Sequence, residues 1–260
     1  MRPRLYSRSW HSFFLASFFP FFLAAQEPFR VPFACAANDL DSVGLSCSDA
    51  EPCPIYLEIS SVALNGNKLL ASGNIHSSSG TISSVLLLSE DSGLTWKEPT
   101  ARIPAAALEQ VQFYNLQDGW AAGETQYPLP RDPFILLTTD SGASWRQVSV
   151  GEEGSPGYVQ RFWFDSAQHG ELIVDAGKSQ PGGRYLTYET ETGGTSWTLR
   201  GKSDQQPKLR RAPASLENPE WRARPSKDGK VYNIEPKTGA PLAIEIATCR
   251  DQPAEEKPPQ

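Results

Sequence analysis

The feature that most constrains the fold is an eight-residue pattern that occurs three times. The first copy, residues 89–96, reads S-x-D-x-G-x-T-W. The second, residues 138–145, has threonine in the first position and serine in the seventh. The third, residues 190–197, has Thr192 in place of the aspartate. The three tryptophans lie 49 and 52 residues apart. A period in this range predicts repeated supersecondary units, as in a propeller or a linear array.

Each residue type in the pattern suits the tight turn of a β-hairpin. The aspartate can accept hydrogen bonds from N–H groups two residues ahead, and glycine supplies a positive φ without steric cost. The tryptophan can bury its apolar face while the indole N–H finds a partner. A recurring carboxylate is typical of architecture, whereas a catalytic or calcium-binding pair would be unique in the chain. The predicted structural residues are Ser89, Asp91, Gly93, Trp96, Thr138, Asp140, Gly142, Trp145, Thr190, Gly194 and Trp197.

These turns have the pattern of the Asp-box, also called the BNR repeat. Residues 117–123 (QDGWAAG) precede the second copy. Together they resemble the repeat of the photosystem II assembly and stability factor family and its bacterial relatives. The resemblance covers roughly residues 55–200. It implies an Asp-box β-propeller without known catalytic machinery. Sialidases and other glycosidases, sortilin-type receptors and xyloglucanases carry the same box, so the resemblance is specific for the repeat only.

The N-terminus has the pattern of a secretory signal. Three arginines lie among the first eight residues, and residues 13–25 are mostly apolar but too short to span a membrane. We predict a signal peptide over residues 1–25. An alternative cleavage site follows residue 36. This predicts export to the periplasm or the extracellular space without a stable membrane span. The alternatives are an uncleaved signal that anchors the protein and a lipoprotein signal ending at Cys35.

Charge and cysteine content narrow the class of protein further. The formal net charge of −6 argues against nonspecific nucleic-acid binding, which needs a basic surface. In an exported protein the four cysteines, Cys35, Cys47, Cys53 and Cys249, predict disulfide bonds. Cys47 and Cys53 could form a local bridge. The preferred alternative joins one of them to Cys249 and so ties the first repeat to the last strand.

Strand and turn signals predict an all-β fold, a small propeller of about four blade-like, four-stranded units. An irregular segment over residues 38–54 precedes the propeller-like domain over 55–249, and a disordered tail follows over 250–260. The fourth unit is degenerate, because it lacks the box, and the N-terminal segment could supply its missing strand. The alternative is an incomplete array that needs a partner or oligomer to cover its ends. A seven-bladed ring does not fit a chain of this length.

Two segments are candidate binding regions. Residues 124–133 are predicted to form a long, proline-rich loop, in which Tyr127, Arg131 and Asp132 are candidate binding residues. A basic stretch runs from Arg200 to Lys230, and its Arg210 and Arg211 are candidates for docking an anionic partner. The alternative for both segments is a solvated loop or linker.

No motif asks for a metal or a cofactor, because a mature chain would retain only His76 and His169 among its histidines. The sequence therefore predicts an exported, noncatalytic binding or assembly module with an unidentified protein or glycan partner. The alternative is an exo-acting, sialidase-like glycosidase. Residues 102–104 (RIP) resemble part of the sialidase F/Y-R-I-P motif, although here they follow the first box instead of preceding it. A convergent cluster of arginine, carboxylate and tyrosine side chains would favour the glycosidase.

Overall fold

The computed structural model describes residues 27–33, 55–78, 80–126, 128–178, 181–212 and 219–246, and the regular elements in these ranges are all β-strands. Several predictions fall outside the described residues: those for the signal peptide, the segment 38–54, the four cysteines, Tyr127 and the tail. No helix within the described ranges has the length and apolar character needed to cross a membrane.

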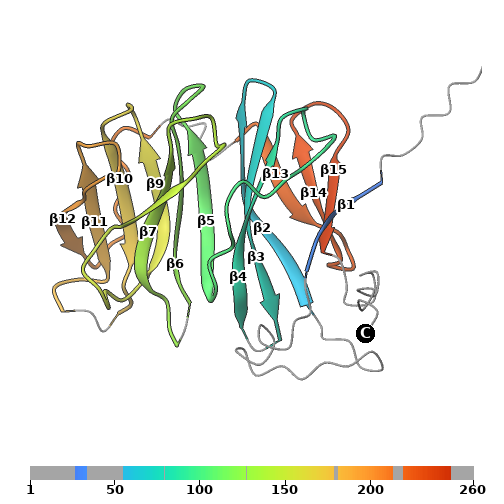
Figure 1. Ribbon diagram of the computed structural model, residues 1–260. Helices are drawn as coiled ribbons and strands as arrows, with labels where there is room; N and C mark the ends of the chain where they lie inside the picture. Colours follow the sequence, from blue (N-terminus) through green and yellow to red (C-terminus); the bar gives the residue numbers. More distant parts are fainter. Residues whose placement is uncertain are drawn as a thin grey trace, which may run out of the picture.

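The strands form four sheets (Figure 1). Sheet I contains β2 (Ile55–Asn65), β3 (Lys68–Ser77) and β4 (Thr81–Ser89). Sheet II contains β5 (Ala106–Phe113), β6 (Gly119–Thr125), β7 (Arg131–Thr138) and β8 (Arg146–Ser149). Sheet III contains β9 (Tyr158–Phe164), β10 (Gly170–Asp175), β11 (Tyr185–Thr190) and β12 (Thr198–Ser203). Sheet IV contains β13 (Trp221–Pro225), β14 (Val231–Pro236), β15 (Leu242–Ile246) and β1 (Phe29–Val31).

Sheets I, II and III are antiparallel meanders, as expected from hairpin signals between short apolar runs. Gly66, in the turn between β2 and β3, has a φ of 64°, which glycine adopts without strain. Sheet IV is completed by β1, which pairs in parallel with β15. The fourth strand of the last unit thus comes from before the first repeat, although it lies upstream of the irregular segment predicted over residues 38–54.

Two predicted details are wrong. The first repeat has no fourth strand among the described residues. Only isolated bridges form beside β4, from Lys97 to Leu88 and from Pro104 to Ser83, and Pro99 between them cannot donate a ladder hydrogen bond. The long loop over residues 124–133 is also shorter than expected. Thr125 ends β6 and pairs with Arg131, which begins β7, so Arg131 and the following Asp132 lie on a strand.

The sheets lie side by side in the order III, II, I, IV (Figure 1). Each contact between neighbours has its own apolar core. The core between sheets IV and I contains Val31, Trp96 and Ile244. The core between sheets I and II contains Phe134, and the core between sheets II and III contains Phe162. Among the described residues no such core joins sheet III to sheet IV. The structure thus confirms the all-β, propeller-like class with four units, and the arc opens between III and IV.

The three repeated turns, residues 89–96, 138–145 and 190–197, explain this order. A Cβ on Gly93 would lie 2.1 Å from Leu242 of sheet IV, so the first turn packs directly on that sheet. In the third turn, the Gly193 carbonyl accepts a hydrogen bond of 2.9 Å from the indole of Trp120 in sheet II. Each turn therefore rests on the preceding sheet of the arc. Sheet IV has no copy of the turn with which to contact sheet III.

Candidate functional site

The first repeated turn is a closed network of hydrogen bonds. Ser89 Oγ accepts from the Gly93 N–H at 2.7 Å and donates to Asp91 Oδ1 at 2.8 Å. Asp91 accepts from the Thr95 N–H at 2.8 Å and from its hydroxyl at 2.6 Å, four residues ahead instead of the expected two. The Trp96 indole donates to the Gly93 carbonyl at 3.2 Å. The hydrogen bonds from Thr95 hold the pKa of Asp91 down at about 2.

The second turn repeats this network. Thr138 Oγ1 accepts from the Gly142 N–H at 3.0 Å, and Asp140 accepts from the Ser144 N–H at 2.9 Å. The Trp145 indole donates to the Gly142 carbonyl at 2.9 Å. Hydrogen bonds from Ser144 hold the pKa of Asp140 at about 2. Both carboxylates are thus ionised near neutral pH, where the N–H and hydroxyl donors of their own turns already bind them.

The third turn keeps this geometry without a carboxylate. Thr192 Oγ1 accepts from the Ser196 N–H at 3.0 Å, and Thr190 Oγ1 accepts from the Gly194 N–H at 3.1 Å. The Trp197 indole donates to the Gly194 carbonyl at 3.1 Å. Because a hydroxyl can replace the aspartate here, the common property of the three turns is a local acceptor for the backbone.

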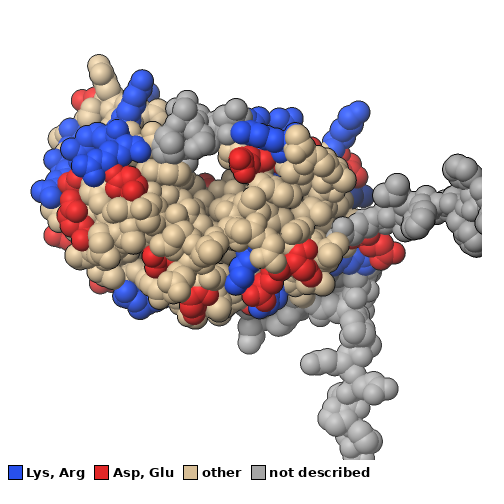
Figure 2. Space-filling model, turned by 90° about the horizontal axis from the view of Figure 1, so that it is seen from above, with Lys and Arg blue, Asp and Glu red and all other residues tan. Residues whose placement is uncertain are grey.

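The best candidate for a binding site is a central cavity of about 660 Å³. It is lined by the first strands of the four sheets, β2, β5, β9 and β13, together with residues just before β13. Seen from above, the molecule is hollowed near its middle (Figure 2). Ligand sites of proteins are commonly concave and receive side chains from several elements. The four strands therefore build one site from segments far apart in the sequence.

A β-bulge recurs at the same place in β2, β5 and β9. The register shifts there, so that Ser60, Glu109 and Gln160 have no direct partner on the neighbouring strand. All three residues line the cavity. A bulge re-aims a side chain, and bulges are frequent beside functional sites. The same irregularity, repeated in three sheets, thus delivers three different polar side chains to one place.

Two of these bulge residues have unusual environments. Burial raises the pKa of the Glu109 carboxyl, and the nearby charge of Glu58 raises it further. The side-chain oxygen of Gln160 is buried and has no hydrogen-bond partner among the described residues. A buried polar atom without a partner is uncommon in folded proteins. The cavity therefore offers an acceptor that a ligand N–H or O–H group could satisfy.

The cavity wall also carries aromatic and basic side chains. Trp163 and Trp221 are half-buried on it, and Arg161, Arg222 and Arg224 line it as well. Guanidinium groups bind carboxylates and phosphates through paired N–H donors, and tryptophan offers a broad apolar face with a polar edge. This combination suits a polar ligand with a flat, weakly apolar face and negative charge.

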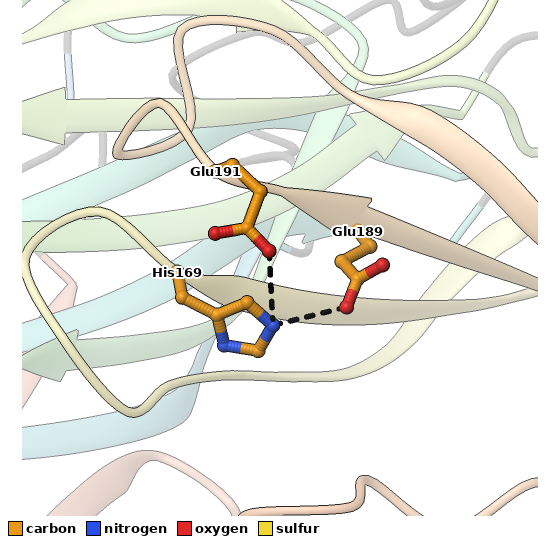
Figure 3. Close-up of side chains that lie close together, drawn as sticks. All are labelled: His169, Glu189 and Glu191. Carbon is orange, nitrogen blue, oxygen red and sulfur yellow. Dashed lines mark hydrogen bonds and ion pairs between the residues drawn. The ribbon is translucent and has the colours of Figure 1, made fainter.

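A second group of titratable side chains surrounds His169, in sheet III, and does not line the cavity. Its Nδ1 lies 2.7 Å from Asp165 Oδ1. Its Nε2 lies 3.1 Å from Glu189 Oε1 and 3.9 Å from Glu191 Oε1 (Figure 3). Burial alone would lower the pKa of His169, but the bonds to Glu189 and Asp165 raise it above its ordinary value. The imidazole is therefore held between carboxylates on both sides.

The residues predicted to dock partners make internal ion pairs. Arg210 lies 2.9 Å from Glu189 and also binds Glu171, and Arg211 lies 3.0 Å from Asp165. Both arginines remain about two-thirds exposed. In sheet II, Arg131 Nε lies 3.4 Å from Asp132 Oδ2, while Tyr127 lies outside the described residues. Neither pair lines the central cavity.

Among the cavity residues, only those at positions 219–224, which include Arg222 and Arg224, belong to a segment singled out from the sequence, the basic stretch from Arg200 to Lys230. One further signal points to the bulge residues. Ser60, Glu109 and Gln160 lie 49 and 51 residues apart, close to the spacing of the repeated tryptophans. Aligning the repeats therefore places them at equivalent positions of three first strands. What the alignment does not show is the bulge, which turns these positions toward the cavity.

No family model matches the chain. Among curated proteins, the chain is similar to vacuolar protein sorting/targeting protein 10 of Schizosaccharomyces japonicus, with 26% identity over 97 residues. The matched part is 37% of this chain and 6% of that protein.

Similar solved structures include YCF48 from Cyanidioschyzon merolae, with 16% identity, a TM-score of 0.39 and coverage of 76% of this chain and 59% of that one. The α-L-arabinanase of Penicillium chrysogenum has 14% identity and a TM-score of 0.38, with coverage of 76% and 63%. The α-L-arabinofuranosidase Arb93A of Fusarium graminearum has 15% identity and a TM-score of 0.36, with coverage of 60% and 50%. The chain thus spans half to two-thirds of these structures, and the comparisons assign it to no family.

Proposed function

We propose that this chain is an exported Asp-box propeller module that binds a polar ligand in its central cavity without transforming it. Export is inferred from the N-terminal sequence, and a disulfide from Cys47 or Cys53 to Cys249 is part of the proposal. The single observation that carries the binding function is the convergence of three bulge residues, two tryptophans and three arginines on one cavity.

The chemistry of the wall favours an acidic oligosaccharide as the ligand. A sugar ring can stack on Trp163 or Trp221, because the indole face is broad and its edge is polar. Its hydroxyl groups match the unpartnered oxygen of Gln160. A carboxylate on the sugar would match the cavity arginines. These contacts suit a glycan-binding role for the exported protein.

The test is titration calorimetry with tetragalacturonic acid as the probe and neutral cellotetraose for comparison. The wild-type protein should bind the acidic tetrasaccharide more tightly. Trp163→Ala should weaken binding about tenfold or more, since a buried aromatic contact is worth on the order of 1–2 kcal/mol. Tyr114→Ala is the matched control, because Tyr114 is an exposed aromatic residue outside the cavity. Equal affinities for wild type and Trp163→Ala would contradict the proposal.

A glycosidase is the second candidate, and one observation favours it. Glu109, whose pKa is raised, shares the cavity with the carboxyl group of Glu220. Hydrolysis of a glycosidic bond uses an acid with a raised pKa opposite a second carboxylate. Mass spectrometry of the incubated tetrasaccharide separates the two functions. We expect intact ligand, whereas cleavage that Glu109→Gln abolishes would establish the enzyme.

A further inference from the structure

We propose that His169, Glu189 and Glu191 form a binding site for a divalent transition-metal ion, with Zn²⁺ as its natural probe. Their ligand atoms come from the end of the turn before β10, from β11 and from the residue that follows β11. One atom from each residue lies within 4.8 Å of the other two (Figure 3). An imidazole with two carboxylates is a donor set that suits zinc.

The distances fit such an ion. Nε2 of His169 is 3.1 Å from Glu189 Oε1 and 3.9 Å from Glu191 Oε1. Zinc binds nitrogen and oxygen at about 2.0–2.2 Å, so the ligand atoms of a tetrahedral site lie roughly 3.4 Å apart. Rotation of the exposed Glu191 side chain is enough to close the remaining difference, since 65% of it is accessible to solvent. The exposed side leaves a fourth position for water.

The orientation of the imidazole supports the proposal independently. Asp165 lies 2.7 Å from Nδ1, so this nitrogen can donate to the carboxylate. A metal ion that displaces the Nε2 proton would then bind the lone pair on Nε2. Metal-binding histidines almost always donate their other N–H to a carboxylate, carbonyl or water. The turn fixes this geometry, because Ser166 Oγ accepts the backbone N–H of His169 at 2.7 Å. Asp165 is thus a positioning residue for the ligand.

The group is also specific to sheet III. Strand register places Lys68 and Glu90 of sheet I at the positions of His169 and Glu191, and these two residues form an ordinary ion pair of 3.3 Å. The corresponding residue of sheet II for His169 is Asp118. The repeated architecture therefore does not require a histidine between carboxylates. This distinguishes the trio from the aspartates of the repeated turns.

Both carboxylate oxygens of Glu189 contact arginines, so the ion requires that Oε1 be released. Arg200 binds Oε2 at 2.6 Å, while Arg210 shares Oε1 with His169 and also binds Glu171. Because the Arg210 side chain is 67% exposed and has this second carboxylate, it can stay on Glu171 when Oε1 turns to the metal. The exposed Glu191 then supplies the additional negative charge that a divalent cation needs.

The experiment is titration of chelator-treated, untagged protein with ZnCl₂, followed by calorimetry and by the rise in thermal midpoint. We expect one zinc ion per chain. Glu191→Gln and His169→Ala should each weaken binding about tenfold or more, and Asp165→Asn should weaken it by a factor of about 10–100, typical for an orienting carboxylate. Co²⁺ in place of zinc should give a visible absorption spectrum that Glu191→Gln removes.

His76→Ala is the matched control, because His76 is also paired with a glutamate, Glu58, at 2.8 Å but has no second carboxylate in the set. Its zinc affinity should equal that of the wild type. Glu191→Gln keeps the test valid if His169→Ala fails to fold, since Glu191 is exposed. Absence of zinc binding, or binding that Glu191→Gln leaves unchanged, would overturn the proposal.

Discussion

Glu124 and Asp140 show how strongly the local environment changes the pKa of a carboxyl group. The side chain of Glu124, on β6, is inaccessible to solvent and accepts the backbone N–H of Val159 at 2.8 Å. Burial raises the pKa of Glu124 to about 8, although that hydrogen bond opposes the shift. Asp140, bound by its own turn at the surface, has a pKa of about 2. One carboxyl group is mostly neutral at pH 7, and the other is ionised.

This difference gives a prediction for the pH dependence of stability. Glu124 has an unfolded-state pKa of about 4.3 and a folded-state pKa of about 8. Between these values the folded state holds a proton that the unfolded state has lost, so stability falls as the pH rises from about 4 to about 8. Glu124→Gln keeps the size of the side chain and the neutrality of the protonated acid, so it removes the loss of stability at high pH. In urea denaturation, the variant should therefore exceed the wild type near pH 8 and approach it near pH 4.

The control for Glu124→Gln is a variant that removes an exposed carboxylate and leaves Glu124 unchanged. Glu153→Gln provides this control, because Glu153 is exposed in the turn after β8. It should follow the wild-type pH profile. Parallel profiles for Glu124→Gln and the wild type would show that Glu124 is ionised in the folded state.

At the scale of elements, sheets II and III are joined by side-chain amides. Gln112 of β5 donates to the Phe164 carbonyl of β9 at 2.7 Å and accepts the N–H of the same residue at 2.8 Å. Gln110 binds the carbonyl and N–H of Phe162 in the same way, at 2.9 and 3.1 Å. Two glutamines thus satisfy the backbone of a strand that lies in another sheet, along the wall of the cavity.

We predict that Gln112→Met destabilises the protein by about 1–3 kcal/mol, because the new side chain leaves buried backbone groups of Phe164 without partners. Chemical denaturation measures the difference. Gln147→Met, on the outer strand β8 where the side chain is exposed, should change stability little. Equal effects of the two substitutions would mean that the hydrogen bonds of Gln112 do not contribute to the free energy of unfolding.

Most elements could be predicted from local signals. Asn65-Gly66 and Asp228-Gly229 mark hairpins, and the tryptophan turns mark the ends of third strands. The errors arise where proline and charge dominate a segment. Residues 124–133 resemble a loop because they contain three prolines and three charged residues, yet Glu124 is buried between sheets. Local composition cannot show that a neighbouring strand will cover a carboxyl group.

The cavity and the His169 group depend on contacts that no local pattern contains. Trp163 and Trp221 belong to different sheets, and only the curvature of the arc brings them to one wall. His169 and Glu191 lie on neighbouring strand ends, so their proximity follows from register. A sequence with two histidines after the signal segment gives little reason to search for a metal. The spatial pairing supplies that reason.

At the scale of the molecule, sheet IV is attached to the remainder through one core. Val31 of β1 is fully buried there with Ile234 and Ile244, while no comparable core joins sheet IV to sheet III among the described residues. On the open side, Arg210 and Arg211 pair with carboxylates of sheet III. Repeat arrays commonly need such a polar cover at their ends. The arc is therefore least strongly held at its fourth sheet.

We predict that Val31→Ala lowers stability by about 2 kcal/mol, through lost burial and a cavity. The effect should be local. In hydrogen exchange followed by mass spectrometry, the amides of β13–β15 should exchange faster, and those of β9–β12 should keep their protection. Leu129→Ala, at a side chain that is 73% exposed, is the control. Equal acceleration in all four sheets would show instead that the arc opens as one cooperative unit.

The pairing of β1 with β15 has a consequence for how the chain folds. Arg30 and Glu245, which form an ion pair of 2.6 Å across these strands, are 215 residues apart in sequence. Sheets I, II and III assemble from neighbours along the chain, whereas sheet IV must close a loop around all of them. Long-range closure of this kind slows folding. We therefore expect docking of the last sheet to limit the rate. A circular permutant that joins the ends beside β1 and β15 and opens the chain between sheets III and IV would place the sheets in the same order in sequence as in space.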